Sequence, residues 1–241
     1  MVQTSPVRRS SPDKMIYVLV LVIIVQTIYP LTADGSLLTQ IIYSLFYASL
    51  IVSGIVVARE QRQDIRLLTV LGATWFISSI IYNLNQHATW ARFLAYGAII
   101  PYQIAVTRVL LLYIFASKKV TRDVIYAAAA VYILIGAIFV PTYGLIETIT
   151  YEQTGTNAFV DTTVEPGQVF PWQNFAYFSY VTLTTLGFGD IQPVTLVARA
   201  AVTIESVIGV FYTTVIMARL VSLYTAQGVE AEIKHDHTQT G

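Results

Sequence analysis

The residues best suited to chemistry lie in one short stretch, Thr-Leu-Gly-Phe-Gly-Asp at positions 185–190. Two glycines alternate with bulky side chains there, and glycine adopts backbone dihedrals that other residues avoid. Such a strand can turn its carbonyl oxygens to one side, and rings of carbonyl oxygens can replace the hydration shell of an alkali cation. The stretch therefore indicates binding of a dehydrated cation by backbone oxygens rather than catalysis.

The segments beside this stretch indicate how it is positioned. Residues 172–184 are apolar and rich in aromatic side chains, but about a dozen residues are too few to cross a bilayer. Irregular backbone at membrane depth is tolerated only where protein buries it or where it lines water. We therefore expect a half-membrane helix over 172–184, then the glycine stretch, and then the last membrane span.

The composition predicts a membrane protein. Hydrophobic residues make up 55% and charged residues 12% of the 241 positions, whereas a soluble domain carries about 25% charged residues. The net charge is zero, and without a basic patch nothing favours a nucleic-acid partner. The absence of Cys excludes disulfides, thiolate metal sites and Cys nucleophiles. Three scattered His do not favour a metal site, so we expect no cofactor.

Six apolar segments are long enough to cross a bilayer, and they lie at 15–33, 37–58, 65–84, 90–117, 124–147 and 196–224. Lys and Arg in the short loops set the orientation of such helices. Most of them fall on one side, and only Arg92 and Arg199 fall on the other. We therefore expect both termini in the cytoplasm. The alternative, a signal peptide cleaved from the first span, would leave five spans and has a poor cleavage pattern.

At residues 124–224 the chain resembles the potassium channel family, specifically the bacterial-type ion-channel pore domain. The filter of that family reads TVGYG; here it reads TLGFG, preceded by Thr184 and followed by Asp190. Residues 193–196 match the family's approach to its inner helix, and Gly209 falls where the family has a hinge glycine.

The resemblance implies a role for each residue of the stretch. Potassium ions would be coordinated by backbone oxygens and by one threonine hydroxyl of the filter residues Thr185, Leu186, Gly187, Phe188 and Gly189. Thr184 would lie at the cavity end of the filter. The carboxylate of Asp190 would lie at the outer mouth and attract cations. The short helix before the filter would aim the negative end of its dipole at a cation in the cavity.

The last span would form the cavity wall below the filter. Spacings of three and four residues place Val210, Thr213 and Met217 on one face of the helix, and the resemblance implies that Gly209 is a gating hinge. One filter per chain cannot close a ring, so we expect a cyclic assembly of several copies. The family has four, which implies a homotetramer.

The filter departs from the family at two positions. Family members often have Tyr where Phe188 stands, with its hydroxyl bonded to a Trp; Tyr177 and Phe178 occupy the positions where a Trp pair is often found. Some bacterial relatives place a carboxylate where Val181 stands, to pair with the aspartate that corresponds to Asp190. These departures predict a filter of different rigidity and altered inactivation rather than lost selectivity.

Glu205 lies one helical turn before Gly209, and we expect it to pack behind the filter as a support. Two roles are open for it. The first is a buried carboxylate that is hydrogen-bonded to the pore helix or to the filter backbone. The second is a proton-sensitive support, because desolvation favours the neutral form of a carboxyl group.

The first four spans lack the charges of a strong voltage sensor. The fourth contains only Arg92 and Arg108, whereas steep gating uses about three to four charges per subunit. Arg108 can reach lipid phosphate by snorkelling, or it can act as a single mobile charge. We expect four regions, which are a disordered N-terminus (1–14), a four-helix unit (15–117), a pore domain (118–225) and a short cytoplasmic tail (226–241).

The sequence thus predicts an all-α membrane protein with six transmembrane helices, a re-entrant pore helix and a selectivity filter. We expect a plasma-membrane channel that conducts potassium passively, with potassium ions and membrane lipid as its partners. The alternatives are a weakly selective monovalent cation channel, a structural assembly protein, and a secondary transporter, for which inverted repeats would be expected.

Overall fold

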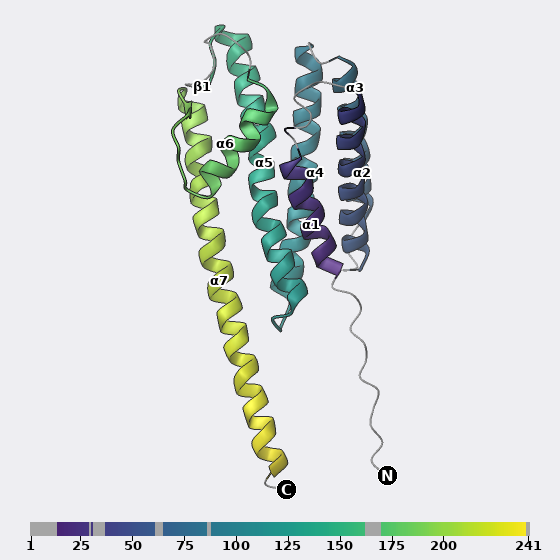
Figure 1. Ribbon diagram of the computed structural model, residues 1–241, viewed down its shortest axis with the longest axis vertical. Helices are drawn as coiled ribbons and strands as arrows, with labels where there is room; N and C mark the ends of the chain where they lie inside the picture. The colour runs from purple at the N-terminus through teal and green to yellow at the C-terminus, as the bar shows by residue number, and fades with distance from the viewer. Residues whose placement is uncertain are drawn as a thin grey trace.

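The computed structural model describes residues 14–28, 30, 37–60, 65–85, 88–161 and 170–239. Long helices make up most of this part of the chain, with one short helix and a two-stranded ribbon at one end (Figure 1). In chain order the elements are α1 (Lys14–Thr27), α2 (Leu37–Glu60), α3 (Ile65–Leu84), α4 (Thr89–Ala116), α5 (Arg122–Thr154), β1 (Phe159–Asp161), α6 (Trp172–Leu183), β2 (Ile191–Pro193) and α7 (Leu196–Gln239). The all-helical fold expected from the sequence is confirmed.

Four of the described helices are long and apolar enough to cross a membrane, namely α3, α4, α5 and α7. Helix α1 is shorter than the expected span over 15–33, because it has only 14 residues and ends at Thr27. Pro30 follows closely, and the residue before a proline disfavours helical dihedrals. The count of six spans stays a prediction, and the expected disordered segment lies outside the described residues except for Lys14.

Helices α5 and α7 are longer than the sequence predicts. Thr121 begins α5 by accepting a hydrogen bond from the N–H of Val124 (3.4 Å), and Gly155 ends it in a left-handed conformation with φ +68°. The helix therefore extends seven residues past position 147. Helix α7 has 44 residues, which corresponds to about 66 Å at 1.5 Å per residue. Residues 226–239 of the expected tail continue this helix.

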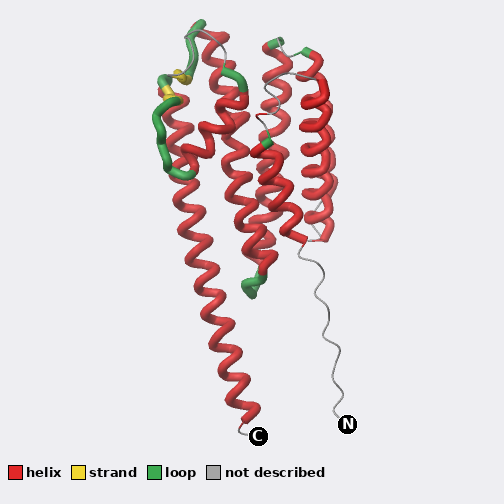
Figure 2. The backbone as a smooth tube through the Cα atoms, viewed as in Figure 1, coloured by secondary structure: helices red, strands yellow, loops and turns green. Residues whose placement is uncertain are grey.

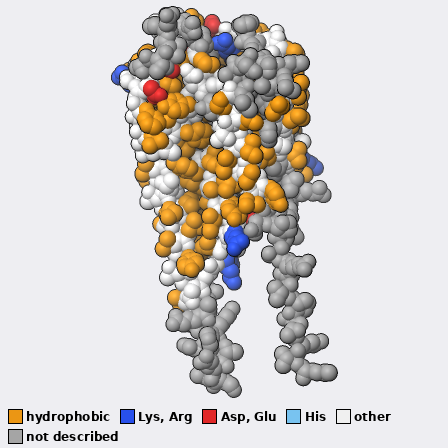
Figure 3. All heavy atoms as spheres, in the orientation of Figure 1, with side chains coloured by type: hydrophobic (Ala, Val, Ile, Leu, Met, Phe, Trp, Pro, Cys, Tyr) orange, Lys and Arg blue, Asp and Glu red, His pale blue; other side chains and the backbone are white. Residues whose placement is uncertain are grey.

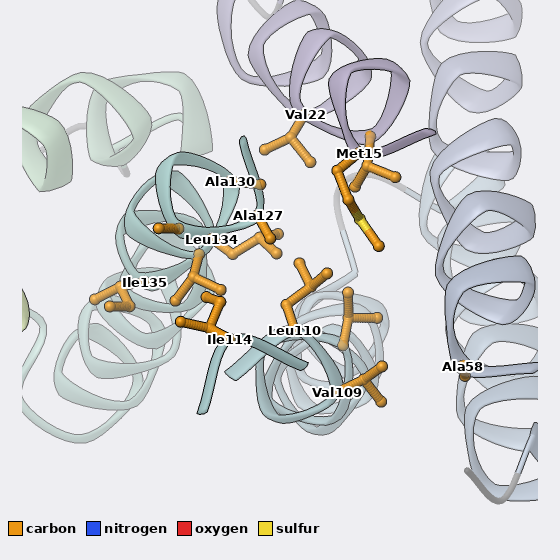
Figure 4. Close-up of a cluster of buried hydrophobic side chains, with 14 of the residues drawn as sticks. Met15, Val22, Ala58, Val109, Leu110, Ile114, Ala127, Ala130, Leu134 and Ile135 are labelled. Atoms are coloured by element: carbon orange, nitrogen blue, oxygen red, sulfur yellow. The ribbon is translucent and has the colours of Figure 1, made fainter. Parts of the chain in front are cut away.

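The first four helices share a hydrophobic core with α5. Helices α4 and α5 pack extensively, and α1 also lies directly against α5. Buried side chains of these three helices meet in one cluster (Figure 4), including Met15, Val22, Leu110, Ile114 and Leu134. The unit at 15–117 is therefore attached to the C-terminal half through α1 and α4, while α2 and α3 lie farther from α7 (Figure 1).

Candidate functional site

The site is formed by α6 and the seven residues that follow it. Helix α6 has 12 residues, about 18 Å of helix, and it runs from the upper end of the bundle toward its middle (Figure 1). The chain then returns as an irregular segment to β2 at the same end (Figure 2). Pro171 precedes α6, and Thr184 ends it. The short apolar helix expected at 172–184 is therefore present.

The backbone of the returning segment alternates in handedness. Thr185, Gly187 and Gly189 have φ values of +59°, +58° and +80°. Glycine adopts such values freely, as the sequence predicts for the two glycines. A β-branched residue with positive φ is strained, and such strain concentrates at functional sites. No feature of the sequence predicts a positive φ at Thr185.

The amide groups of this segment fix the direction of its carbonyl groups. The N–H of Thr185 donates to the carbonyl of Thr182 (3.0 Å), and the N–H groups of Leu186 and Gly187 both donate to the carbonyl of Val181 (3.0 and 3.5 Å). In a trans peptide the C=O of the preceding residue points opposite to the N–H, and no peptide bond in the described chain is cis. The carbonyls of Thr184, Thr185 and Leu186 therefore point away from α6, on a side where the single chain is exposed.

The lower end of the segment is tied to α5, α6 and α7. The Thr184 hydroxyl donates to the carbonyl of Tyr180 (2.6 Å), and the Tyr132 hydroxyl of α5 donates to the carbonyl of Leu183 (3.1 Å). A Cβ placed on Gly209 would lie 2.7 Å from the same Leu183 oxygen. Gly209 therefore permits a close approach of α7 to the end of α6, a role that the sequence did not predict.

The three expected cavity residues lie on α7 below this contact, and all are exposed in the single chain: Val210, Thr213 and Met217. The hydroxyl of Thr213 can donate to the carbonyls of Gly209 (3.2 Å) or Val210 (3.0 Å) of its own helix. These side chains are thus available to line a space between chains.

Glu205 is fully buried where α5, α6 and α7 meet. The hydroxyls of Tyr143 on α5 and Ser179 on α6 (2.5 Å) both bond its carboxyl group. Ser179 also contacts the carbonyl of Gly136 (2.8 Å). One hydroxyl proton cannot serve two acceptors, so Ser179 has two arrangements: it donates to the Glu205 carboxylate, or it donates to Gly136 and accepts from a protonated Glu205 carboxyl. Glu205 is therefore buried against α6, and its described partners are one side chain of α5 and one of α6 rather than backbone groups of the glycine segment; its role as a support stays a prediction.

At the β2 end of the segment, the side chain of Asp190 accepts a hydrogen bond from the Tyr177 hydroxyl (2.7 Å) and another from the N–H of Ile191 (3.0 Å). The bond from Tyr177 lowers the pKa of Asp190 below its ordinary value, and the weaker effect of burial opposes it. The ring of Tyr177 also stacks on Phe188, with centroids 6.5 Å apart and planes within 2°. Tyr177 therefore gives Asp190 a hydroxyl partner in place of the carboxylate that Val181 lacks, and its ring packs on Phe188, which has no hydroxyl group to bond.

Arg219 on α7 contacts the end of α4, and the sequence did not predict this contact. Its Nη2 atom donates to the carbonyls of Ile114 (3.4 Å), Phe115 (2.7 Å) and Ser117 (3.2 Å), at the C-terminal end of α4. Its guanidinium group also lies 5.0 Å from the centre of the Phe115 ring. A cation at a helix C-terminus is favourable because of the free carbonyls and the helix dipole. This contact joins α7 to the four-helix unit.

The site holds no recognisable metal-binding cluster, since no three His, Cys, Asp or Glu side chains gather anywhere in the described part of the chain. The charged groups of the site are single carboxyls, each satisfied by hydroxyl or amide donors. What the arrangement offers to a ligand is a row of backbone oxygens.

The comparison with protein families agrees with this geometry. Residues 146–226 match a family model described as an ion channel. The match supports an ion channel family. It covers about a third of the chain, and it contains α6, the glycine segment, β2 and most of α7. No curated protein and no solved structure matches the chain. The ion-channel match, together with helices able to span a membrane, supports a membrane protein that conducts ions passively.

Proposed function

We propose that the chain is the subunit of a homotetrameric potassium channel and that residues 185–189 form its selectivity filter. The observation that carries this proposal is the row of carbonyls of Thr184, Thr185 and Leu186, which point away from α6 because their neighbouring amides donate to it. Four such rows around an axis would replace the water shell of a potassium ion. Oxygens of Gly187 and Phe188 would continue the row outward.

The neighbouring groups favour a cation at both ends of the filter. At the inner end, the C-terminus of α6 carries about half a negative charge, directed at a cavity lined by Val210, Thr213 and Met217. At the outer end, Asp190 keeps its negative charge to a lower pH than an ordinary aspartate, because Tyr177 donates a hydrogen bond to it.

The exposed surface of the single chain supports an assembly of several copies. Only 11% of the most apolar 18-residue stretch of α7 is buried within the chain. The side chains of Leu186 and Phe188 are 62% and 66% exposed, although they belong to a segment whose backbone is tightly tied to α6. A second copy that packs against them would cover these surfaces, and cyclic closure is the usual solution for identical chains.

The distribution of charge supports the membrane orientation. On the face that Figure 3 shows, hydrophobic side chains cover the middle, and most charged side chains lie above or below them. We place the glycine segment outside and the α4–α5 turn, which carries Lys118, Lys119 and Arg122, in the cytoplasm, because positive loops stay inside. The plasma membrane is the proposed location.

Rubidium uptake into vesicles that contain the purified protein tests this function. Gly187→Ala should abolish uptake, since φ +58° disfavours a side chain by about 1–2 kcal/mol. Gly155→Ala is the matched control, because it has φ +68° and equally open surroundings but lies at the end of α5. It should lose a little stability and keep its uptake.

The outcome separates the candidate functions. Equal uptake in both variants would contradict the proposed tetrameric filter. So would a purified particle whose mass is not four times that of one chain. A reversal potential that does not distinguish potassium from sodium would instead support the weakly selective cation channel.

A further inference from the structure

Glu147 is a buried carboxylate whose hydrogen bonds go to the loop after α5 rather than to the glycine segment. It lies near the outer end of α5, and only 1% of it is exposed. Its Oε2 atom accepts hydrogen bonds from the N–H groups of Ala158 (2.7 Å) and Phe159 (3.2 Å). Its Oε1 atom accepts from the side-chain amide of Asn157 (2.5 Å). One carboxyl group thus holds three consecutive residues of the loop after α5.

The pattern of donors requires two acceptor oxygens. Each of these three partners of Glu147 is an N–H group, so both carboxylate oxygens serve as acceptors. An amide side chain offers only one acceptor oxygen. In the Glu147→Gln variant, the new NH₂ group therefore faces either the two backbone N–H groups or the side-chain amide of Asn157, which would have to rotate out of its present orientation to offer its oxygen. This requirement for two acceptor oxygens distinguishes Glu147 from Glu205, whose carboxyl group can also donate a proton to the Ser179 hydroxyl.

The loop held by Glu147 is bonded in turn to the chain that leaves the glycine segment. The carbonyl of Ala158 accepts a hydrogen bond from the N–H of Val194 (2.9 Å). The next residues form β1, which pairs with β2 in antiparallel register, with Asp161 opposite Ile191. Ile191 directly follows Asp190 and donates its N–H to the Asp190 side chain.

The same loop is also packed against the helix before the glycine segment. Phe159 is fully buried, and its ring contacts Phe175 and Phe178 of α6 at centroid distances of 5.2 and 5.5 Å. The side chain of Asp161 accepts a hydrogen bond from Asn174, also on α6 (3.3 Å). Residues 157–161 therefore join α5, α6 and β2, and the Glu147 carboxylate holds the first three of them.

We propose that Glu147 is a positioning residue for the outer end of the selectivity filter. By fixing residues 157–159, it fixes β1, and β1 fixes the strand that begins immediately after Asp190. The spacing of the outer carbonyl oxygens depends on this strand, and so does the discrimination between potassium and sodium. The inference rests on the proposed filter function, and it assigns a selectivity role to a side chain that touches no ion.

The experiment compares permeability ratios of potassium to sodium, taken from reversal potentials in bilayers. Glu147→Gln should lower the ratio by about tenfold, a change that corresponds to about 1.4 kcal/mol. Glu152→Gln is the matched control, since Glu152 lies five residues further on α5 and its exposed carboxylate bonds the Thr89 hydroxyl. Its ratio should equal that of the wild type.

A milder variant keeps the test decisive if Glu147→Gln does not assemble. Asn157→Ala removes one donor and leaves both backbone bonds to the carboxylate, so it should give a smaller fall in the ratio. An unchanged ratio in the assembled variants, even with reduced thermal stability, would overturn the inference and leave Glu147 a purely structural residue. A wild-type protein without potassium selectivity would contradict the proposed function instead, so the two failures are distinguishable.

Discussion

Replacing Gly209 by alanine tests how closely α7 must approach the end of α6, directly before the proposed filter. The new Cβ would lie 2.7 Å from the carbonyl oxygen of Leu183 and 3.0 Å from its Cδ1 atom. Ordinary contacts of a Cβ begin at 3.4 Å, so helix and carbonyl must separate by about 0.7 Å. The oxygen belongs to the backbone at the end of α6, and the Tyr132 hydroxyl also holds it. It cannot turn away as a side chain could, and Thr184 follows directly.

The expected cost comes from two opposing effects. Overpacking of this kind destabilises a protein by about 1–3 kcal/mol, whereas alanine in place of glycine inside a helix gains about 1 kcal/mol. Gly209→Ala should therefore be destabilised by about 0–2 kcal/mol in total. Gly228 lies in the same helix, and a Cβ there meets nothing within 4 Å. Gly228→Ala should show only the gain of about 1 kcal/mol from alanine in a helix. The two variants should therefore differ in stability by about 1–3 kcal/mol.

The assay is heat-induced dissociation of the purified assembly, combined with permeability ratios of potassium to sodium. Gly209→Ala should dissociate at a lower temperature than Gly228→Ala, and its permeability ratio should fall because the displaced carbonyl adjoins the proposed filter. A gating hinge at Gly209, as the family resemblance implies, predicts instead fewer openings at an unchanged ratio. Equal dissociation temperatures in the two variants would refute the close-contact reasoning.

Three further outcomes follow from the hydrogen bonds of the site. Glu205→Gln should keep nearly all stability and flux, because its amide can donate to Ser179 as a protonated carboxyl does, whereas Glu205→Leu should lose about 1–3 kcal/mol; equal losses in thermal dissociation would contradict this. Tyr177→Phe should raise the pKa of Asp190 back toward its ordinary value of about 3.9. In the wild type, the ionised Asp190 carboxylate attracts cations to the proposed outer mouth, and this attraction is lost only as the pH falls through the lowered pKa of Asp190. Rubidium flux in Tyr177→Phe should therefore decline at a higher outer pH. Coincident pH profiles of the two proteins would exclude the role of this bond. Arg219→Gln should weaken the contact between α7 and α4 by about 1 kcal/mol, seen as a lower dissociation temperature, and an unchanged temperature would show that the contact is not stabilising.

The sequence alone was sufficient for the bounds of α3 and α4 and for the backbone conformation of the two glycines after α6. Apolar runs of about 20 residues identify membrane-spanning helices because the bilayer removes the water that would otherwise satisfy the backbone. This rule gave α3 with the observed ends, and it gave α4 within one residue at each end. The glycines at 187 and 189 predicted backbone conformations that the structure has, because positive φ is a local property of glycine.

Helix ends and side-chain partners were less predictable. The early end of α1 and the extension of α5 to Thr154 depend on turn residues whose effect is weaker than the apolar pattern. The proline and the terminal glycine that mark these ends are visible in the sequence, but neither fixes a boundary by itself.

Only the tertiary structure decided which groups surround the glycine segment. The carboxyls of Glu147 and Glu205 differ in role because one faces N–H donors alone and the other faces two hydroxyls, and those partners lie from 10 to 62 residues away in the chain. No local pattern encodes such a distinction. The composition and spacing of apolar residues determine that helices form and insert, whereas the packing of α5, α6 and α7 determines which buried polar groups meet, because a buried polar group is tolerated only where the fold brings it a partner.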